Sequence, residues 1–278
     1  MKKVLIIGYG SIGKRHAELF KSEGSVVSLV SAQENTGFKT YPTISDALSN
    51  DQHEFVLVTN ETSKHLGSLQ ELIYLKYSGV VLVEKPIFEK VSSLSHSFKG
   101  LYVLYNLRMS PLLEILKAKL QSQKIVSANV YCGQYLPSWR PTRDYRETYS
   151  AKKEAGGGVI RDLSHELDYT TWLVGDFKQV SALGGHLSNL EITSDDVFNL
   201  VGCSTTTSSI NITVNYLDRL PKRTIIINTN EHTYSLDLIK GNLWEDAKEI
   251  MSDVKAVDTY LIQTKNILAL FSFSLIDC

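Results

Sequence analysis

Short, continuous apolar runs alternate with longer helical segments along the first part of the chain. Five runs are rich in apolar and β-branched residues, at positions 4–7, 26–30, 55–59, 80–83 and 101–105. The segments between them carry apolar residues at helical spacing, as at Leu66, Leu69 and Ile73. Apolar strands that alternate with helices are typical of a parallel sheet covered on both faces. The pattern predicts a doubly wound α/β domain over residues 1–108.

From Lys124 onward, short runs of alternating apolar and polar residues are joined by turns. Six of them have the alternation of half-buried strands: 125–134, 179–186, 197–204, 209–216, 223–228 and 233–239. Pro111 is expected to begin a helix that ends near Leu120, and a second helix is expected over 159–174. Residues 109–278 are therefore predicted to form an α+β domain with a large, mostly antiparallel open sheet.

Composition excludes several function classes. A formal net charge of −1 over 278 residues gives no basic field for nucleic acid or an anionic membrane. No apolar run approaches the roughly 18 residues of a membrane helix, and the run at 4–7 is too short for a signal peptide. Three widely spaced cysteines form no zinc motif. We expect no metal site and a reducing, cytoplasmic location.

A glycine-rich turn, Gly8-x-Gly10-x-x-Gly13, follows the first apolar run and precedes a helix. Such glycines allow a tight turn, close approach of a pyrophosphate and close packing of the helix on the sheet. The helix N-terminus, which includes Ser11 and Ile12, attracts phosphate charge. The motif predicts a Rossmann-type dinucleotide site, although similar turns also occur for structural reasons alone.

The end of the second strand bears on cofactor choice. An acidic residue there would bind the ribose hydroxyls of NAD, but Ser31 follows Val30, and Glu34 lies further along. Ser31 could hydrogen-bond the 2′-phosphate of NADP, although no arginine stands beside it. The sequence therefore favours NADP slightly over NAD.

A polar turn that begins with Thr59 and Asn60 follows the third strand. The carboxyl edge of a doubly wound sheet is where ligands bind, so His65 could line the nicotinamide side of the pocket. Alternatively, Thr62 or Ser63 merely caps the next helix and His65 is a surface residue.

Glu84-Lys85-Pro86 ends the fourth strand. In a closed site beside a positively charged nicotinamide, Lys85 would hold its proton less tightly and could transfer it at neutral pH. Pro86 would stiffen the turn and keep the amine aimed. The alternative is an exposed lysine at a strand end, paired with Glu84.

Three consecutive glycines at 156–158 lead into the second predicted helix. At about 100° per residue, Asp162, His165, Glu166 and Tyr169 share one helical face. A histidine oriented by an aspartate is suited to proton transfer near neutral pH. The alternative is a solvated polar face.

Together these motifs resemble the Gfo/Idh/MocA oxidoreductases, the family of glucose-fructose oxidoreductase and inositol dehydrogenase. In chain order they are Gly8-x-Gly10-x-x-Gly13 with Lys14-Arg15-His16, Glu84-Lys85-Pro86, Asn106-x-Arg108-x-x-Pro111, and His165-Glu166-Leu167-Asp168. The resemblance implies an NAD(P)-dependent dehydrogenase or reductase that acts on a hydroxyl or carbonyl of a sugar, amino sugar or sugar nucleotide.

The resemblance also implies roles for individual residues. Lys85 and His165 would handle the substrate proton, with Asp162 as supporting acid. In the family this aspartate more often stands four residues before the histidine, where this chain has Arg161. The residues expected at the cofactor are Gly8, Gly10, Ser11, Ile12, Gly13, Ser31, Thr59, Asn60, His65, Glu84 and Lys85.

A segment rich in arginines and aromatic residues, at 135–146, is similar to one in members associated with bacterial surface-sugar pathways. It suits an anionic or nucleotide-linked sugar, although a surface loop packed on Trp139 would look the same. The residues expected at the substrate are Arg108, Trp139, Arg143, Tyr145 and Tyr169.

Family members usually continue well past a helix like residues 258–270, whereas this chain has a short apolar tail at 271–278. An oligomer partner could cover such a tail. The resemblance implies a homodimer or homotetramer formed through the antiparallel sheet.

Two other functions fit the same motifs. One is a catalytically silent NAD(P)-sensing regulatory protein, against which Lys85 and His165 argue. The other is a redox-neutral lyase or glycosidase that uses bound NAD transiently, for which the same two residues would serve.

Overall fold

The computed structural model describes residues 1–252, 254 and 258–270, and its contacts divide the chain into two units. The first unit comprises Met1–Asn106 together with residues 258–270, and the second comprises residues 107–252 and 254. The change of unit lies close to the boundary expected at Arg108. The segment 258–270, however, belongs to the first unit rather than to the second. The predicted apolar tail at 271–278 lies outside the described residues.

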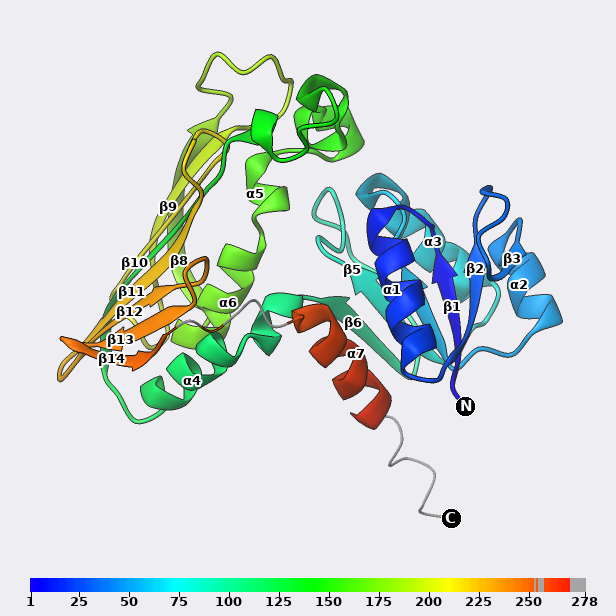
Figure 1. Cartoon of the computed structure of the whole chain (residues 1–278), viewed down its shortest axis with the longest axis horizontal. Coiled ribbons are helices and arrows are strands. Elements are labelled where there is room, and N and C mark those ends of the chain that lie inside the picture. Colours follow the sequence, from blue (N-terminus) through cyan, green and yellow to red (C-terminus); the bar gives the residue numbers. More distant parts are fainter. Residues whose placement is uncertain (253, 255–257, 271–278) are drawn as a thin grey trace. The chain divides into compact units, whose positions relative to one another are not determined.

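Six parallel strands form the sheet of the first unit (Figure 1), in the order β3-β2-β1-β4-β5-β6. They are β1 (Lys3–Ile7), β2 (Val26–Val30), β3 (Lys39–Tyr41), β4 (Phe55–Val58), β5 (Val80–Glu84) and β6 (Gly100–Leu104). This is the doubly wound order, in which successive strands are added first on one side of β1 and then on the other, so that the strand order reverses between β1 and β4. Strand β3 was not predicted, because three residues with a lysine and a threonine make no apolar run.

Helices cover both faces of this sheet. They are α1 (Ser11–Ser22), α2 (Ile44–Asn50), α3 (Thr62–Tyr74) and α7 (Thr259–Leu270). Phe20 of α1 and Ile267 of α7 join one apolar cluster with Ile6 of β1, whereas Leu69 of α3 joins a second cluster with Ile7. Successive strand residues point to opposite faces, so the continuous apolar strands serve both clusters.

The second unit is built on an eight-stranded sheet in the order β14-β13-β12-β11-β7-β10-β9-β8 (Figure 1). Its strands are β7 (Ile125–Gly133), β8 (Phe177–Gly185), β9 (Val197–Ser204), β10 (Ser209–Asn215), β11 (Lys222–Thr229), β12 (Thr233–Asp237), β13 (Asn242–Glu245) and β14 (Lys248–Met251). Among the described strands of this sheet, only β7 and β10 pair in parallel. The last two strands were not predicted, since they are short and largely polar.

Helices cover one face of this second sheet. They are α4 (Pro111–Leu120), α5 (Val159–Asp162) and α6 (His165–Val174), and the single-turn helices are η1 (Asn106–Met109), η2 (Leu136–Ser138), η3 (Tyr145–Glu147), η4 (Tyr149–Ala151) and η5 (Lys153–Ala155). Leu116 and Leu173 pack there against Ile212 and Ile225. The predicted fold class is confirmed. Within the described residues, no helix has the length and apolar character needed to cross a membrane.

Candidate functional site

The glycine turn after β1 is tight on one side and open on the other. Gly8 has φ +95°, and a Cβ on Gly13 would collide with the carbonyl oxygen of Gly8 and the hydroxyl of Thr59. Thr59 donates from Oγ1 to that carbonyl at 2.8 Å. A Cβ on Gly10 would meet no atom within 4 Å. Gly8 and Gly13 therefore hold the turn against the sheet, and Gly10 leaves room for a ligand to approach the backbone.

The N-terminus of α1 fits an anionic group. Its first turn contains no acidic residue, and Gly10 at the N-cap offers no side chain to satisfy the first backbone N–H groups. These N–H groups and the helix dipole favour a phosphate. Ser11 and Ile12 are the first two residues of α1, so both expected cofactor contacts lie at this end.

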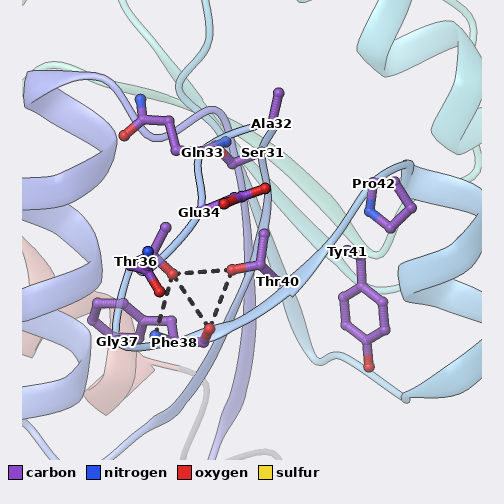
Figure 2. A pocket seen from close by; sticks show the side chains of 11 residues that line it. Ser31, Ala32, Gln33, Glu34, Thr36, Gly37, Phe38, Thr40, Tyr41 and Pro42 are labelled. Atoms are coloured by element: carbon purple, nitrogen blue, oxygen red, sulfur yellow. Dashed lines mark hydrogen bonds between the residues drawn. The ribbon is translucent and has the colours of Figure 1, made fainter.

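A hollow of about 670 Å³ opens beside the end of β2. Its lining residues are Ser31, Ala32, Gln33, Glu34, Asn35, Thr36, Gly37, Phe38, Thr40, Tyr41 and Pro42. Figure 2 shows the Glu34 side chain between Ser31 and the hydrogen-bonded pair of Thr36 and Thr40, whose hydroxyls are 3.0 Å apart. Ser31 accepts the backbone N–H of Gln33 at 3.0 Å. The hollow thus has an acidic side chain and, among its described lining residues, no lysine or arginine.

His65 is a buried link between two loops. One ring nitrogen, Nε2, lies 3.1 Å from the carbonyl oxygen of Asn60, and Nδ1 lies 3.1 Å from that of Pro86. Burial lowers the pKa of His65, against the effect of these carbonyls. The alternative of a surface residue is wrong, because the side chain is buried. A role beside the nicotinamide stays a prediction.

Glu84 is the last residue of β5 and is only 8% exposed. Its Oε1 lies 2.7 Å from Nε2 of His16, and its Oε2 accepts the backbone N–H of Lys85 at 3.2 Å. The sequence analysis quoted His16 within the motif Lys14-Arg15-His16 but gave it no role of its own. Its contact with Glu84 makes it a functional candidate.

The elements of the first unit converge on one edge. Gly8, Ser31, Thr59 and Lys85 each follow directly after a strand, namely β1, β2, β4 and β5. All four strands are parallel, so their carboxyl ends share one edge of the sheet. The glycine turn, the hollow and the lysine therefore lie along the same edge.

The polar helix of the second unit is broken. The single helix expected over 159–174 is two helices, α5 and α6, separated by Leu163 and Ser164. The four polar residues thought to share one face therefore divide into two groups. Asp162 ends α5 and His165 begins α6, and both are buried.

Two tyrosines hold the carboxylate of Asp162. Tyr149 donates to Oδ1 at 2.7 Å, and Tyr216 donates to Oδ2 at 2.5 Å. Burial and the neighbouring Asp162 charge raise the pKa of both tyrosines, which keeps them protonated as donors. Asp162 is thus fixed just before His165, and its role as supporting acid stays a prediction.

Glu166 and Tyr169 point into the core instead. Tyr169 has no exposed surface and donates to Oε1 of Glu166 at 3.2 Å, while Nε of Arg223 donates to the same oxygen at 2.8 Å. This burial leaves no surface of Tyr169 for a substrate, contrary to expectation. The tyrosine is a core residue between α6 and the sheet.

Arg108 makes a two-pronged ion pair with Asp168. Its Nε and Nη2 donate to the two carboxylate oxygens at 2.8 and 2.7 Å. Burial raises the pKa of Asp168, and the Arg108 guanidinium opposes that rise. The arginine thus anchors η1 to α6, and contact with a substrate stays a prediction.

In the arginine-rich segment at 135–146, aromatic side chains pack against the rest of the second unit, whereas Arg143 is exposed to solvent. Trp139 meets Tyr216 edge-on with ring centres 5.2 Å apart, and the Tyr145 hydroxyl accepts the N–H of Glu191 at 3.2 Å. Arg143 is exposed, and its role at the substrate stays a prediction. Packing of the loop on Trp139 is therefore observed, as the alternative interpretation expected.

Comparison with solved structures gives the same fold. The chain aligns over all its length, and over 90% of the other chain, with the WlbA dehydrogenase from Bordetella pertussis in complex with NADH and UDP-GlcNAcA, at 17% identity and a TM-score of 0.79. An oxidoreductase from Thermotoga maritima aligns over 99% of this chain and 89% of its own, at 17% identity and a TM-score of 0.81. UDP-N-acetylglucosamine 3-dehydrogenase from Acidithiobacillus ferrooxidans aligns over 98% of this chain and 89% of its own, at 16% identity and a TM-score of 0.75.

Residues 116–233 match the model of the GFO/IDH/MocA C-terminal domain. This match covers most of the second unit and confirms the resemblance inferred from the motifs. No curated protein matches the sequence. At such low identities, the likeness to the solved structures shows the fold alone.

The buried pair of Glu166 and Arg223 gives a stability prediction. Arg223→Met leaves a carboxylate with no exposed surface and no cation, so we expect the free energy of unfolding to fall by about 3–5 kcal/mol in urea denaturation. The double variant Arg223→Met/Glu166→Gln removes the charge and keeps an acceptor for Tyr169. It should recover most of the loss, and equal stability of the two variants would contradict the prediction.

Proposed function

We propose that this chain, whose residues 116–233 match the model of the GFO/IDH/MocA C-terminal domain, is an NAD(P)-dependent oxidoreductase acting on a CH–OH group or its carbonyl. The observation that carries the proposal is the convergence of an open glycine turn, an adjoining hollow and Lys85 at one edge of a doubly wound sheet. The first unit would bind the cofactor, and the second would bind the substrate and form the oligomer.

The residues of the chain would carry the proton chemistry. When bound, the nicotinamide exchanges a hydride with the substrate carbon. Lys85 and His165 would take the proton from the substrate hydroxyl during oxidation and return it during reduction, as general acids and bases do. Asp162, fixed by Tyr149 and Tyr216, would support His165.

The cofactor would lie along the carboxyl edge of the first sheet. Its pyrophosphate would pass Gly10 and the N-terminus of α1, and its adenosine would enter the hollow beside Ser31. The carboxylate of Glu34 in that hollow would accept hydrogen bonds from the ribose hydroxyls and would repel a 2′-phosphate. We therefore propose NAD as the cofactor. The sequence favoured NADP slightly because of Ser31, but the described lining of the hollow contains no lysine or arginine that would bind the 2′-phosphate.

An anionic sugar or sugar nucleotide is the proposed substrate. Arg143 offers an exposed cation beside the aromatic residues of the same segment. Two structural neighbours support this class, since one is in complex with UDP-GlcNAcA and another is a UDP-N-acetylglucosamine 3-dehydrogenase. We place the protein in the cytoplasm, where Cys132 and Cys203, which form no disulfide, would stay reduced.

A homo-oligomer is proposed from the uncovered face of the second sheet. By strand register, Leu183, Val201, Ile226 and Trp244 share the face opposite to the helices. Leu183 is 76% exposed. An exposed apolar group of this kind is typical of a protein interface.

Loss of the Lys85 amine is expected to stop turnover and spare binding. Lys85→Ala should keep NADH affinity near that of the unmutated protein and lower kcat by about 10²- to 10⁴-fold. Rates are measured on a panel of free amino sugars and UDP-linked sugars by net formation of NADH. Full activity of Lys85→Ala would refute the assignment, and product without net NADH would favour the redox-neutral alternative. Binding of NADH with no turnover of the panel by the unmutated protein would favour the regulatory one.

Gly10→Val is the control for Lys85→Ala, because it should abolish cofactor binding rather than proton transfer. A Cβ at Gly10 meets no protein atom within 4 Å, so the fold should persist while the pyrophosphate path is blocked. NADH binding should therefore be lost in this variant alone.

Cofactor preference is expected to follow Glu34. Glu34→Arg should shift the ratio of NADPH to NADH affinity by about tenfold or more, because a carboxylate is replaced by a phosphate-binding guanidinium. Isothermal titration measures both dissociation constants. Ser31→Ala tests the interpretation that Ser31 binds the 2′-phosphate of NADP. If Ser31→Ala loses NADPH affinity and Glu34→Arg leaves both affinities unchanged, NADP is favoured.

The oligomer is expected to depend on the uncovered sheet face. Leu183→Arg places a charge in the proposed interface and should lower the mass in solution, measured by light scattering, to that of one chain. Tyr74→Arg changes another highly exposed hydrophobic residue, on α3, and should leave the mass unaltered. A single chain in the unmutated protein would contradict the proposal.

A further inference from the structure

We propose that His16 is a positioning residue for Lys85, acting through the carboxylate of Glu84. The inference rests on the proposed function, since it takes Lys85 to be the proton carrier. Every contact that it uses lies within the first unit. It assigns a role to a histidine that the proposed function does not use.

The carboxylate of Glu84 is held at both oxygens. It is 8% exposed, and a buried carboxylate requires hydrogen-bond partners. Oε1 lies 2.7 Å from Nε2 of His16, which is itself 1% exposed, and Oε2 accepts the N–H of Lys85 at 3.2 Å. The imidazole therefore fixes a side chain that in turn fixes the backbone of the lysine.

The bond from Oε2 to the next backbone N–H sets the orientation of the peptide between Glu84 and Lys85. That peptide determines the direction in which the Lys85 side chain leaves the backbone. Without the Nε2 donor, Oε1 would lose its partner and the Glu84 side chain would be free to rotate. A small displacement of the amine follows, and a displacement of about 1 Å can lower a rate by about 10²-fold.

The turn is braced on its other flank as well. Nδ1 of His65 lies 3.1 Å from the carbonyl oxygen of Pro86, so the residues on both sides of Lys85 are tied to a buried histidine. His65 belongs to α3 and His16 to α1, on opposite faces of the sheet. Lys85 is therefore held from both faces, and His16 connects it to the helix that begins at the glycine turn.

Helix α7 completes the surroundings of His16. The ring of Tyr260 meets His16 edge-on at 5.5 Å between centres, and the Arg15 guanidinium lies 4.2 Å from the centre of the same ring. Arg15 also donates to Asp258 at 2.9 Å. The C-terminal helix thus keeps the imidazole in place and excludes water from its contact with Glu84.

Three variants of the full chain test the inference. His16→Leu removes the donor and keeps an apolar side chain in the core, whereas His16→Gln keeps an N–H donor at a similar reach. His53→Leu removes another buried histidine of the same unit, one that precedes β4 and lies outside this brace. Each is compared with the unmutated protein and with Lys85→Ala, using the panel sugar that gives the highest rate.

His16→Leu should lower kcat by about 10²-fold with little change in KM for the sugar or in the dissociation constant for NADH. Hydrogen exchange of the Lys85 amide, followed by mass spectrometry, should lose its protection. His16→Gln should recover most of kcat and of the protection, and His53→Leu should show neither loss. A purely structural role of His16 would lower the folded fraction of His16→Leu and leave its kcat per folded molecule unchanged, and that result would overturn the positioning role.

Failure of this inference can be told apart from failure of the proposed function. If Lys85→Ala is inactive and His16→Leu keeps full kcat, the positioning role alone is wrong. It is equally wrong if His16→Leu loses NADH affinity, which would place His16 at the cofactor, or if His16→Gln restores nothing. If Lys85→Ala keeps full activity, Lys85 is not the proton carrier, and the positioning role of His16 falls with that assignment. If the unmutated protein binds no NADH and turns over no sugar of the panel, the proposed function itself is wrong.

Discussion

The close approach of Gly13 to Gly8 and Thr59 is the contact on which the first unit depends. It joins the start of α1 to the ends of β1 and β4, at the point where strand order reverses. A larger residue at Gly13 would force the helix off the sheet, and with it Phe20 out of the core and His16 away from Glu84. One backbone contact thus sets both the cofactor turn and the support of Lys85.

Much of the fold could be predicted from the sequence because the signals were local. Continuous apolar strands such as 80–83 and the proline-led helix at Pro111 appear in the structure nearly as expected. β3, β13 and β14 were missed because pairing with a neighbouring strand, rather than their own composition, makes them strands. The break between α5 and α6 has no sequence signal that we can identify.

For the candidate site too, residues in local motifs could be predicted from the sequence, whereas residues that depend on distant partners could not. Gly10 and Lys85 follow from motifs, because their chemistry depends on their place in a local turn. Tyr169 was misassigned, since helical periodicity gives the angle between residues but does not say which side meets Arg223. The contacts of His16 and Tyr216 could not be predicted because their partners, Glu84 and Asp162, are distant in sequence.

The placement of α7 in the first unit has a consequence for synthesis on the ribosome. The second unit is continuous in sequence, whereas the first gains its last helix only after the whole second unit has been translated. Domains generally fold as units while the chain emerges. During synthesis, Phe20 and His16 therefore stay incompletely covered until Tyr260 and Ile267 have left the exit tunnel.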